Sequence, residues 1–316
     1  MYYLGIDLGG MSIKAGICDD NGKILYKDTC VTVRNEDGDR IVNDMAALCL
    51  KVIADAGLKV SDIEYAGIAS PGSADSEKGV IIYAATLPFL NYPIADKLAE
   101  KTGIKKVYID NDANAAAKGE ATYGAAKGYK DSLFITIGTG VGGGIIIDGK
   151  VYSGFNFSGA ELGHTVIVKD GEECSCGRKG CLECYASASG LIKLTKKKML
   201  ECKDSEMWKI ADGDIEKVNG KTAFDALRAG DKAGIEVVNE YIGYLGCGIV
   251  DFINIFQPEV LSIGGGISKE GEYLLAPLRE IVKREQYSRY SDKQTTIKIA
   301  ALGNDAGIIG AASLGK

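Results

Sequence analysis

The chain has 316 residues, 46% of them hydrophobic and 25% charged, which is the composition of a globular protein with room for two cores. Its formal net charge of −6 argues against a general nucleic-acid binder, because such proteins usually present a basic face. No uncharged apolar run approaches the roughly 20 residues that a membrane span needs, and the first residues do not resemble a signal peptide. We therefore expect a cytoplasmic protein with neither nucleic-acid nor membrane partners, whose nine cysteines are reduced.

The first part of the chain predicts short strands separated by glycine turns and helices. Apolar runs favour strands, and apolar residues three or four positions apart favour helices. The expected strands are residues 2–7, 12–18, 23–33, 64–70 and 106–110, and the expected helices are residues 38–56, 92–102 and 113–124. Asn111 and Asp112 directly follow one of these strands, at the carboxyl end where open α/β sheets bind ligands.

Residues 132–152 repeat the pattern of the first hairpin. Each copy has a strand, a glycine turn, a second strand, and then an Asx-Gly turn followed by lysine, apolar residues and tyrosine. Two such hairpins at about half-chain spacing favour a duplicated domain, although any two β-hairpins share some of these features. The rest of the chain predicts strands at residues 260–263 and 297–302, and helices at residues 189–202, 221–229, 233–256, 272–284 and 305–312.

Three glycine turns each follow a predicted strand. Glycine allows backbone N–H groups to approach phosphate oxygens closely, so three turns in one chain favour phosphate binding over tight turns without a ligand. No turn fits the Walker A pattern or the dinucleotide fingerprint. Asp7 stands beside the first turn and could hold Mg²⁺ through water, or serve only as a turn residue. The turns are Gly9 and Gly10, then Gly138, Thr139 and Gly140, then Gly264, Gly265 and Gly266.

Asp112 is the candidate general base. Transfer of a phosphoryl group to a hydroxyl needs a positioned carboxylate that accepts the proton. An Asn-Asp pair before a helix is also a common N-cap, so the residues by themselves leave both interpretations open.

One histidine and three cysteines form the strongest metal motif. Zinc prefers four nitrogen or sulfur ligands in a tetrahedron, and His164, Cys174, Cys176 and Cys181 supply them. A zinc ion with four protein ligands would be structural. Cys184 is a fifth possible ligand, and the alternatives are a Cys181–Cys184 redox pair or inert buried thiols.

Together, these motifs resemble those of the ROK family of sugar kinases, and the resemblance covers nearly the whole chain. The phosphate motif stands at residues 7–14, the catalytic motif at residues 111–120, and the zinc and sugar motif at residues 161–183. The length of the chain and residues 195–231 are most similar to the glucokinases of Gram-positive bacteria.

The resemblance implies an α/β fold of the actin-like ATPase type, which is a duplicated RNase H-like fold with two domains around a central cleft. The small domain would comprise residues 1–115 and 295–316. The large domain, residues 116–294, would carry the zinc loop and the dimer surface. A homodimer, or a tetramer, is expected from the family.

The resemblance also assigns roles to residues. Asp112 would deprotonate the 6-hydroxyl of glucose while ATP, with Mg²⁺, donates its γ-phosphoryl group, giving glucose 6-phosphate and ADP. Zn²⁺ would hold His164 and its loop in place, and adenosine would lie near residues 264–266. The sugar would be bound by Gly72, Asn111, Asp112, Glu161, His164 and Glu183. The phosphates would be bound by Asp7, Gly9, Gly10, Ser12, Lys14, Gly138, Thr139 and Gly140.

The sequence departs from the family pattern at three positions. Met11 stands where a threonine usually follows the glycine pair, Thr86 where the family often has a sugar-contacting asparagine, and Cys184 where a threonine is usual. The preferred hexose therefore stays open between glucose and N-acetylglucosamine, N-acetylmannosamine or fructose. Two other classes of protein are alternatives to a kinase. One is a thiol redox or zinc-storage protein, and the other is a non-catalytic sugar-sensing regulator. Such regulators carry an N-terminal helix-turn-helix domain, whereas the phosphate strand here begins at Tyr2.

Overall fold

The structure is a computed structural model that describes residues 1–34 and 37–316, and it contains two compact units. The first unit comprises Met1–Phe134, Gly144–Ala160 and Ala301–Lys316. The second comprises Ile135–Gly143 and Glu161–Ala300. These units differ from the domains expected from the sequence mainly at residues 116–134 and 144–160, which belong to the first unit.

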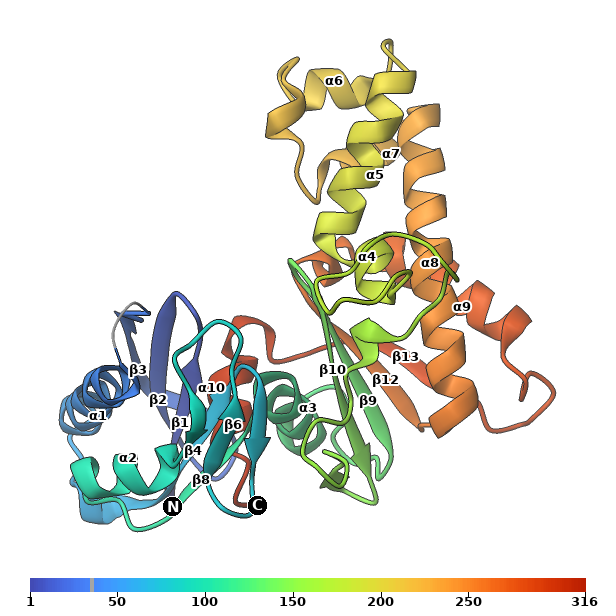
Figure 1. The fold of residues 1–316 in the computed structure, drawn as a ribbon. Coiled ribbons are helices and arrows are strands. Elements are labelled where there is room, and N and C mark those ends of the chain that lie inside the picture. The colour runs from blue at the N-terminus through green and yellow to red at the C-terminus, as the bar shows by residue number, and fades with distance from the viewer. Residues whose placement is uncertain (35–36) are drawn as a thin grey trace. The chain divides into compact units, whose positions relative to one another are not determined.

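The first unit is built on a five-stranded sheet in the order β3-β2-β1-β4-β8 (Figure 1). β1 pairs with β2 antiparallel, whereas β1 and β4, and β4 and β8, pair in parallel. The carboxyl ends of β1, β4 and β8 therefore share one edge of the sheet. The bounds of the strands are β1 (Tyr2–Leu8), β2 (Ser12–Cys18), β3 (Ile24–Val31), β4 (Ile63–Ser70) and β8 (Val107–Asn111).

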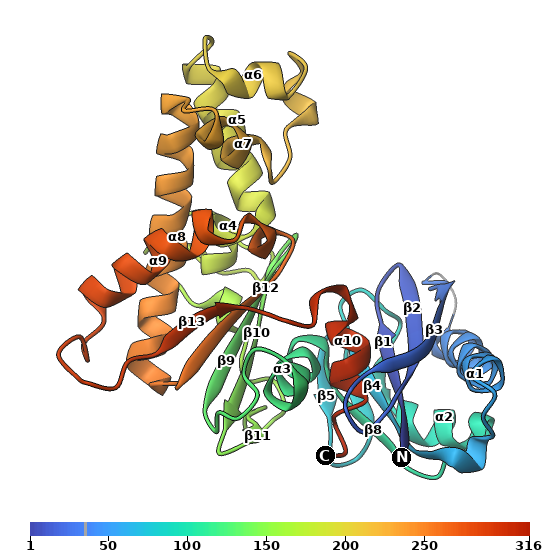
Figure 2. The same cartoon turned by 180° about the vertical axis from the view of Figure 1, so that it is seen from behind.

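Helices cover both faces of this sheet (Figures 1 and 2). On one face, α1 (Gly38–Asp55) and α2 (Ile94–Thr102) pack in a core with Leu4, Ile6 and Leu8 of β1. On the other face lie α3 (Asp112–Tyr123) and α10 (Ala306–Ala311). α10 approaches the sheet closely, because a Cβ atom at position 67 would lie 1.9 Å from the carbonyl oxygen of Ala311. Glycine is therefore required there.

A small antiparallel sheet also belongs to the first unit. It consists of β5 (Ser73–Asp75), β6 (Val80–Tyr83) and β7 (Leu90–Tyr92), in that order. These strands are only three or four residues long, and the sequence analysis did not predict them. Segments this short carry too little sequence pattern to separate a strand from a loop.

The second five-stranded sheet has the order β11-β10-β9-β12-β13. Both sheets have the same strand order. Three strands that are consecutive in the chain lie next to one another, and two later strands continue the sheet beside the first of them, β1 or β9. This shared topology supports the duplication inferred from the two hairpins. The bounds are β9 (Ser132–Ile137), β10 (Val141–Ile147), β11 (Lys150–Val151), β12 (Val260–Gly265) and β13 (Thr296–Ile299).

α8 (Lys232–Phe256) is the central helix of the second unit, and α4, α5, α7 and α9 pack against it (Figure 1). Most apolar side chains of α8 are buried, but one face of the helix, which includes Gly243 and Cys247, is exposed. Among the described residues, no helix has the length and apolar character needed to cross a membrane. The other helices are α4 (Leu182–Ala186), α5 (Ala188–Glu201), α6 (Glu206–Ile210), α7 (Thr222–Arg228) and α9 (Glu272–Glu285).

Candidate functional site

The corner between β8 and α3 carries the predicted catalytic motif. Asn111 is the N-cap of α3, since its side-chain oxygen accepts hydrogen bonds from the backbone N–H groups of Ala113 (2.9 Å) and Asn114 (3.3 Å). Asp112 is the next residue and its side chain is exposed, with one carboxylate oxygen 2.8 Å from the N–H of Ala113. The capping role that the sequence left open for the Asn-Asp pair therefore falls chiefly to Asn111.

Gly72 lies directly beside this corner. The side-chain amide of Asn111 donates to the carbonyl oxygen of Gly72 at 3.1 Å. Ser70 and Asn111 are register partners in the β4–β8 pair, which explains why the turn after β4 reaches Asn111. Gly72 has a φ of 88°, and a Cβ atom there would lie 2.1 Å from the carbonyl oxygen of Tyr83. Only glycine fits this turn.

The first glycine turn connects β1 to β2. Asp7 and Lys14 are register partners across these strands, and their side chains form an ion pair of 2.8 Å. The N–H of Gly9 donates to the carbonyl oxygen of Ser12 at 3.0 Å, which closes the turn. Met11 lies at the tip and is 78% exposed. The five predicted residues of this turn, Asp7, Gly9, Gly10, Ser12 and Lys14, thus come together in the first unit.

The second and third glycine turns lie side by side in the second unit. Gly265 has a φ of 83°, and a Cβ atom there would lie 2.3 Å from the carbonyl oxygen of Ile137, the last residue of β9. The turn that begins with Gly138 is closed by a 3.0 Å hydrogen bond from its N–H to the carbonyl oxygen of Gly140. Glycine in such tight turns allows the backbone to approach phosphate oxygens closely.

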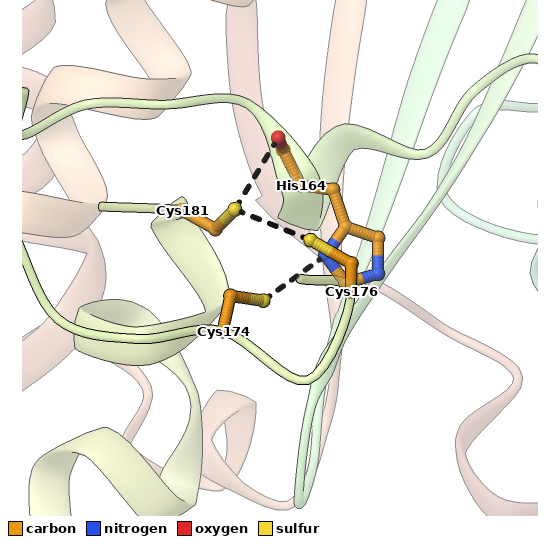
Figure 3. A group of neighbouring side chains, drawn as sticks. All are labelled: His164, Cys174, Cys176 and Cys181. Atoms are coloured by element: carbon orange, nitrogen blue, oxygen red, sulfur yellow. Dashed lines mark hydrogen bonds between the residues drawn. The ribbon is translucent and has the colours of Figure 1, made fainter. Parts of the chain in front are cut away.

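The four predicted zinc ligands converge in the second unit (Figure 3). The ligand atoms of His164, Cys174, Cys176 and Cys181 all lie within 4.8 Å of one another. The sulfur atoms of Cys176 and Cys181 are 3.7 Å apart, and all three cysteines are free thiols. A tetrahedron with Zn–S bonds of about 2.3 Å places its sulfur atoms roughly 3.8 Å apart, so the cluster fits this metal.

Two short helices place the three predicted sugar-binding side chains of this unit. Glu161 is the N-cap of η2 (Leu162–His164), and Cys181 is the N-cap of α4, so that Glu183 lies in its first turn. The two segments are joined by a 2.8 Å hydrogen bond from the N–H of Leu182 to the carbonyl oxygen of Thr165. The His/Cys cluster and the two carboxylates are thus parts of one folded loop.

A family model described as "ROK family" matches residues 3–316 of this chain. The chain belongs to the ROK family. It is 40% identical to a glucokinase of Thermotoga maritima, over 98% of this chain and 96% of that protein. It is 38% identical to a glucokinase of Halalkalibacterium halodurans, over 98% of this chain and 93% of that protein.

Solved structures agree with the family. A ROK family glucokinase from Streptomyces griseus, solved in complex with glucose and AMPPNP, superimposes on this ROK protein with a TM-score of 0.82. The two are 34% identical, and the match covers 99% of each chain. The fold predicted from the resemblance, the actin-like ATPase fold with mixed α/β content, is therefore confirmed.

The thiols of the ROK protein's His/Cys cluster differ in acidity. Burial raises the pKa of Cys181 to about 12, and hydrogen bonds with Cys176 and Cys174 add to the rise. Burial would also raise the pKa of Cys174, but a backbone hydrogen bond from Cys176 and thiol hydrogen bonds outweigh it and hold this pKa at about 6. A thiol that ionises this readily is a good metal ligand.

Cys184 lies outside the cluster. Its sulfur faces the carbonyl oxygen of Glu173 at 3.5 Å, and burial raises its pKa to about 11. The structure therefore favours His164 over Cys184 as the fourth member of the set. The imidazole Nδ1 lies 3.5 Å from the sulfur of Cys174, so the Nε2 atom is the one directed away from the cluster.

Sequence reasoning missed two residues that hold the site together. Asp110, which is only 6% exposed, accepts hydrogen bonds from the N–H of Asn111 (2.7 Å) and the side-chain amide of Asn114 (2.9 Å). Thr32 donates its hydroxyl to the carbonyl oxygen of Gly9 at 2.7 Å. An aspartate that directly follows the apolar residues of a strand was the available signal for Asp110. No local pattern identifies Thr32.

Proposed function

We propose that this ROK protein is an ATP-dependent glucokinase that forms glucose 6-phosphate and ADP. Glucokinases of 38–40% identity over nearly the whole chain support the activity and the sugar. The observation that carries the proposal is the β8–α3 corner. Asn111 caps the helix, and the exposed Asp112 carboxylate follows at the sheet edge where α/β proteins bind ligands.

In the proposed reaction, Asp112 accepts the proton of the sugar 6-hydroxyl. The hydroxyl oxygen then bonds to the γ-phosphorus of ATP, and the bond from that phosphorus to the ADP oxygen breaks. The sugar is held by Gly72, Asn111, Glu161, His164 and Glu183, which keeps its 6-hydroxyl within reach of the base.

The nucleotide phosphates are assigned to the first two glycine turns and the adenosine to residues 264–266. Mg²⁺ bound with ATP would neutralise charge on the transferring group. Asp7 is the proposed carboxylate for this ion, through water, and its ion pair with Lys14 fixes its side chain at the first turn. Lys14 adds a second positive charge beside the phosphates.

We further propose a structural Zn²⁺ bound by His164, Cys174, Cys176 and Cys181. With Nδ1 as its ligand atom, His164 presents Nε2 to a sugar hydroxyl, so one side chain would serve both groups. The enzyme is proposed to act in the cytoplasm as a homodimer. The exposed stripe of α8, at Gly243 and Cys247, is the surface proposed for the dimer.

A coupled kinase assay against a panel of hexoses tests this function. We expect the highest kcat/KM for glucose. In Asp112→Asn, kcat should fall by about 10²–10⁴-fold while glucose still binds, because only the proton acceptor is removed. Near-normal kcat in that variant would show that Asp112 is not the base.

The hexose panel also decides between sugars. N-acetylglucosamine, N-acetylmannosamine and fructose are the alternatives, since Thr86 replaces the asparagine that often contacts the sugar in this family. Higher kcat/KM for one of these would reassign the substrate but keep the reaction. Sugar binding without phosphorylation of any hexose would favour a sugar-sensing regulator.

A further inference from the structure

Glu183 contacts the second glycine turn as well as belonging to the proposed sugar site. Its Oε2 atom accepts a hydrogen bond of 3.0 Å from the N–H of Val141, the first residue of β10. A Cβ atom at position 140 would lie only 2.3 Å from the same oxygen. The carboxylate therefore occupies the space that Gly140 leaves by having no side chain.

The segment around Glu183 holds the whole turn. The N–H of Ala188 donates to the carbonyl oxygen of Gly138 at 2.8 Å, and the hydroxyl of Ser189 donates to that of Thr139 at 2.8 Å. With Glu183 on Val141, three successive parts of the turn are bound by residues 183–189. Because α4 begins directly after Cys181, the same segment is continuous with the His/Cys cluster.

We propose that Glu183 couples sugar binding to nucleotide binding by holding the glycine turn with one carboxylate oxygen and the sugar with the other. This inference rests on the proposed kinase function for its sugar half. A carboxylate has two oxygens with about four acceptor positions, so Oε2 can keep the Val141 N–H while Oε1 accepts a sugar hydroxyl. Glu183 is thus a positioning residue for the nucleotide in addition to a sugar ligand.

The coupling follows from the flexibility of the side chain. A glutamate side chain loses conformational entropy when a ligand fixes it in one rotamer. The sugar and the glycine turn need the same rotamer of Glu183, so this entropy is lost only once when both contacts form. A sugar that binds the other oxygen of Glu183 stabilises the conformer that already contacts the Val141 N–H, so this contact and the turn are populated more fully when the nucleotide binds. By thermodynamic reciprocity, the nucleotide must raise the affinity for the sugar by the same factor.

Two substitutions at position 183 separate the roles. In Glu183→Gln, the amide oxygen can still accept from Val141, but the sugar meets an N–H donor in place of an acceptor. In Glu183→Ala, both contacts are lost. Glu161→Ala is the matched control, because Glu161 is a proposed sugar ligand with no hydrogen bond to the glycine turn among the described residues.

Calorimetric titration of the full chain with AMPPNP and Mg²⁺, without sugar, tests the nucleotide half. We expect Glu183→Ala to weaken AMPPNP binding by about 5-fold or more, the lower end of typical coupling effects. Glu183→Gln and Glu161→Ala should bind AMPPNP as the wild type does. Unchanged AMPPNP affinity in Glu183→Ala would overturn the inference.

The same titration with glucose tests the coupling. In the wild type, saturating AMPPNP should tighten glucose binding by about 5-fold or more, and Glu183→Gln should lower both glucose affinity and this ratio. A wild-type ratio of one would overturn the coupling. If no hexose binds at all, the proposed function fails, and the titration without sugar still decides whether Glu183 positions the turn.

Discussion

At the scale of single residues, Asp110 shows how a buried carboxylate can position the corner between β8 and α3. Its carboxylate accepts from the N–H of Asn111 and the side-chain amide of Asn114, so it fixes the backbone that precedes Asp112. Burial raises the pKa of Asp110, and these two hydrogen bonds only partly oppose the rise. The folded protein therefore holds this charge at a cost in stability.

The pH dependence of the stability of Asp110→Asn tests whether the buried charge destabilises the folded protein. An aspartate with a raised pKa favours the fold when protonated, so its contribution to stability falls as pH rises from its ordinary pKa through the raised value. Asn keeps an acceptor oxygen and carries no charge. We expect the Tm of Asp110→Asn, relative to wild type, to be higher near pH 8 than near pH 4.

Asp110→Leu is the control for the hydrogen bonds. It removes the acceptor of one buried donor, the side-chain amide of Asn114, and of one part-buried donor, the N–H of Asn111, which should cost up to about 1–3 kcal/mol each at every pH. Thermal unfolding followed by circular dichroism measures both variants. If the difference in Tm between Asp110→Asn and wild type is the same at both pH values, burial of the ionised carboxylate does not destabilise the folded protein.

At the scale of elements, the metal loop is a segment with little regular structure of its own. Between η2 and α4, its backbone is held by irregular hydrogen bonds, such as those from the N–H of Ile167 to the carbonyl oxygen of Gly180 (2.9 Å) and from the N–H of Gly180 to that of Glu172 (2.7 Å). Gly177 and Gly180 have φ values of 86° and 78°, which let the chain turn back so that three sulfurs meet. A metal would add a cross-link between the four side chains to these backbone hydrogen bonds.

Metal analysis by atomic emission tests the zinc site. We expect about one Zn²⁺ per chain in the wild type and in Cys184→Ser, and loss of the ion in Cys176→Ser. Removal of the metal by a chelator should lower the Tm and weaken glucose binding, because Glu183 and His164 belong to the same loop. Zinc lost from Cys184→Ser but kept in His164→Ala would reverse the choice of fourth ligand.

At the scale of the whole molecule, Glu120 joins parts of the chain that are distant in sequence. It is fully buried near the end of α3 and accepts hydrogen bonds from the backbone N–H groups of Ala125 (2.6 Å), Ala301 (3.0 Å) and Leu302 (2.8 Å). Ala301 is the residue at which the chain re-enters the first unit after β13. The carboxylate thereby anchors the C-terminal segment that leads into α10.

Glu120→Gln should lower the free energy of unfolding by about 1–3 kcal/mol. The amide has only one oxygen, so one of the three backbone N–H groups that donate to Glu120 would face the amide N–H and lose its acceptor. Glu100→Gln, a change of an exposed glutamate, is the matched control and should stay within about 0.5 kcal/mol of wild type. Urea unfolding measures both variants. Equal stability of the two would show that the buried carboxylate contributes nothing beyond its surroundings.

Features that depend on neighbours along the chain could be predicted from the residues alone. Apolar periodicity predicted the strands of both sheets and most helices, and the spacing of His164 and the three cysteines predicted a set that the fold brings together. The tertiary structure alone decided which residues brace these features. Glu183 reaches Val141 across 42 positions, and Glu120 reaches Leu302 across 182. Such contacts depend on chain segments that meet only after folding, so no local pattern of residues encodes them.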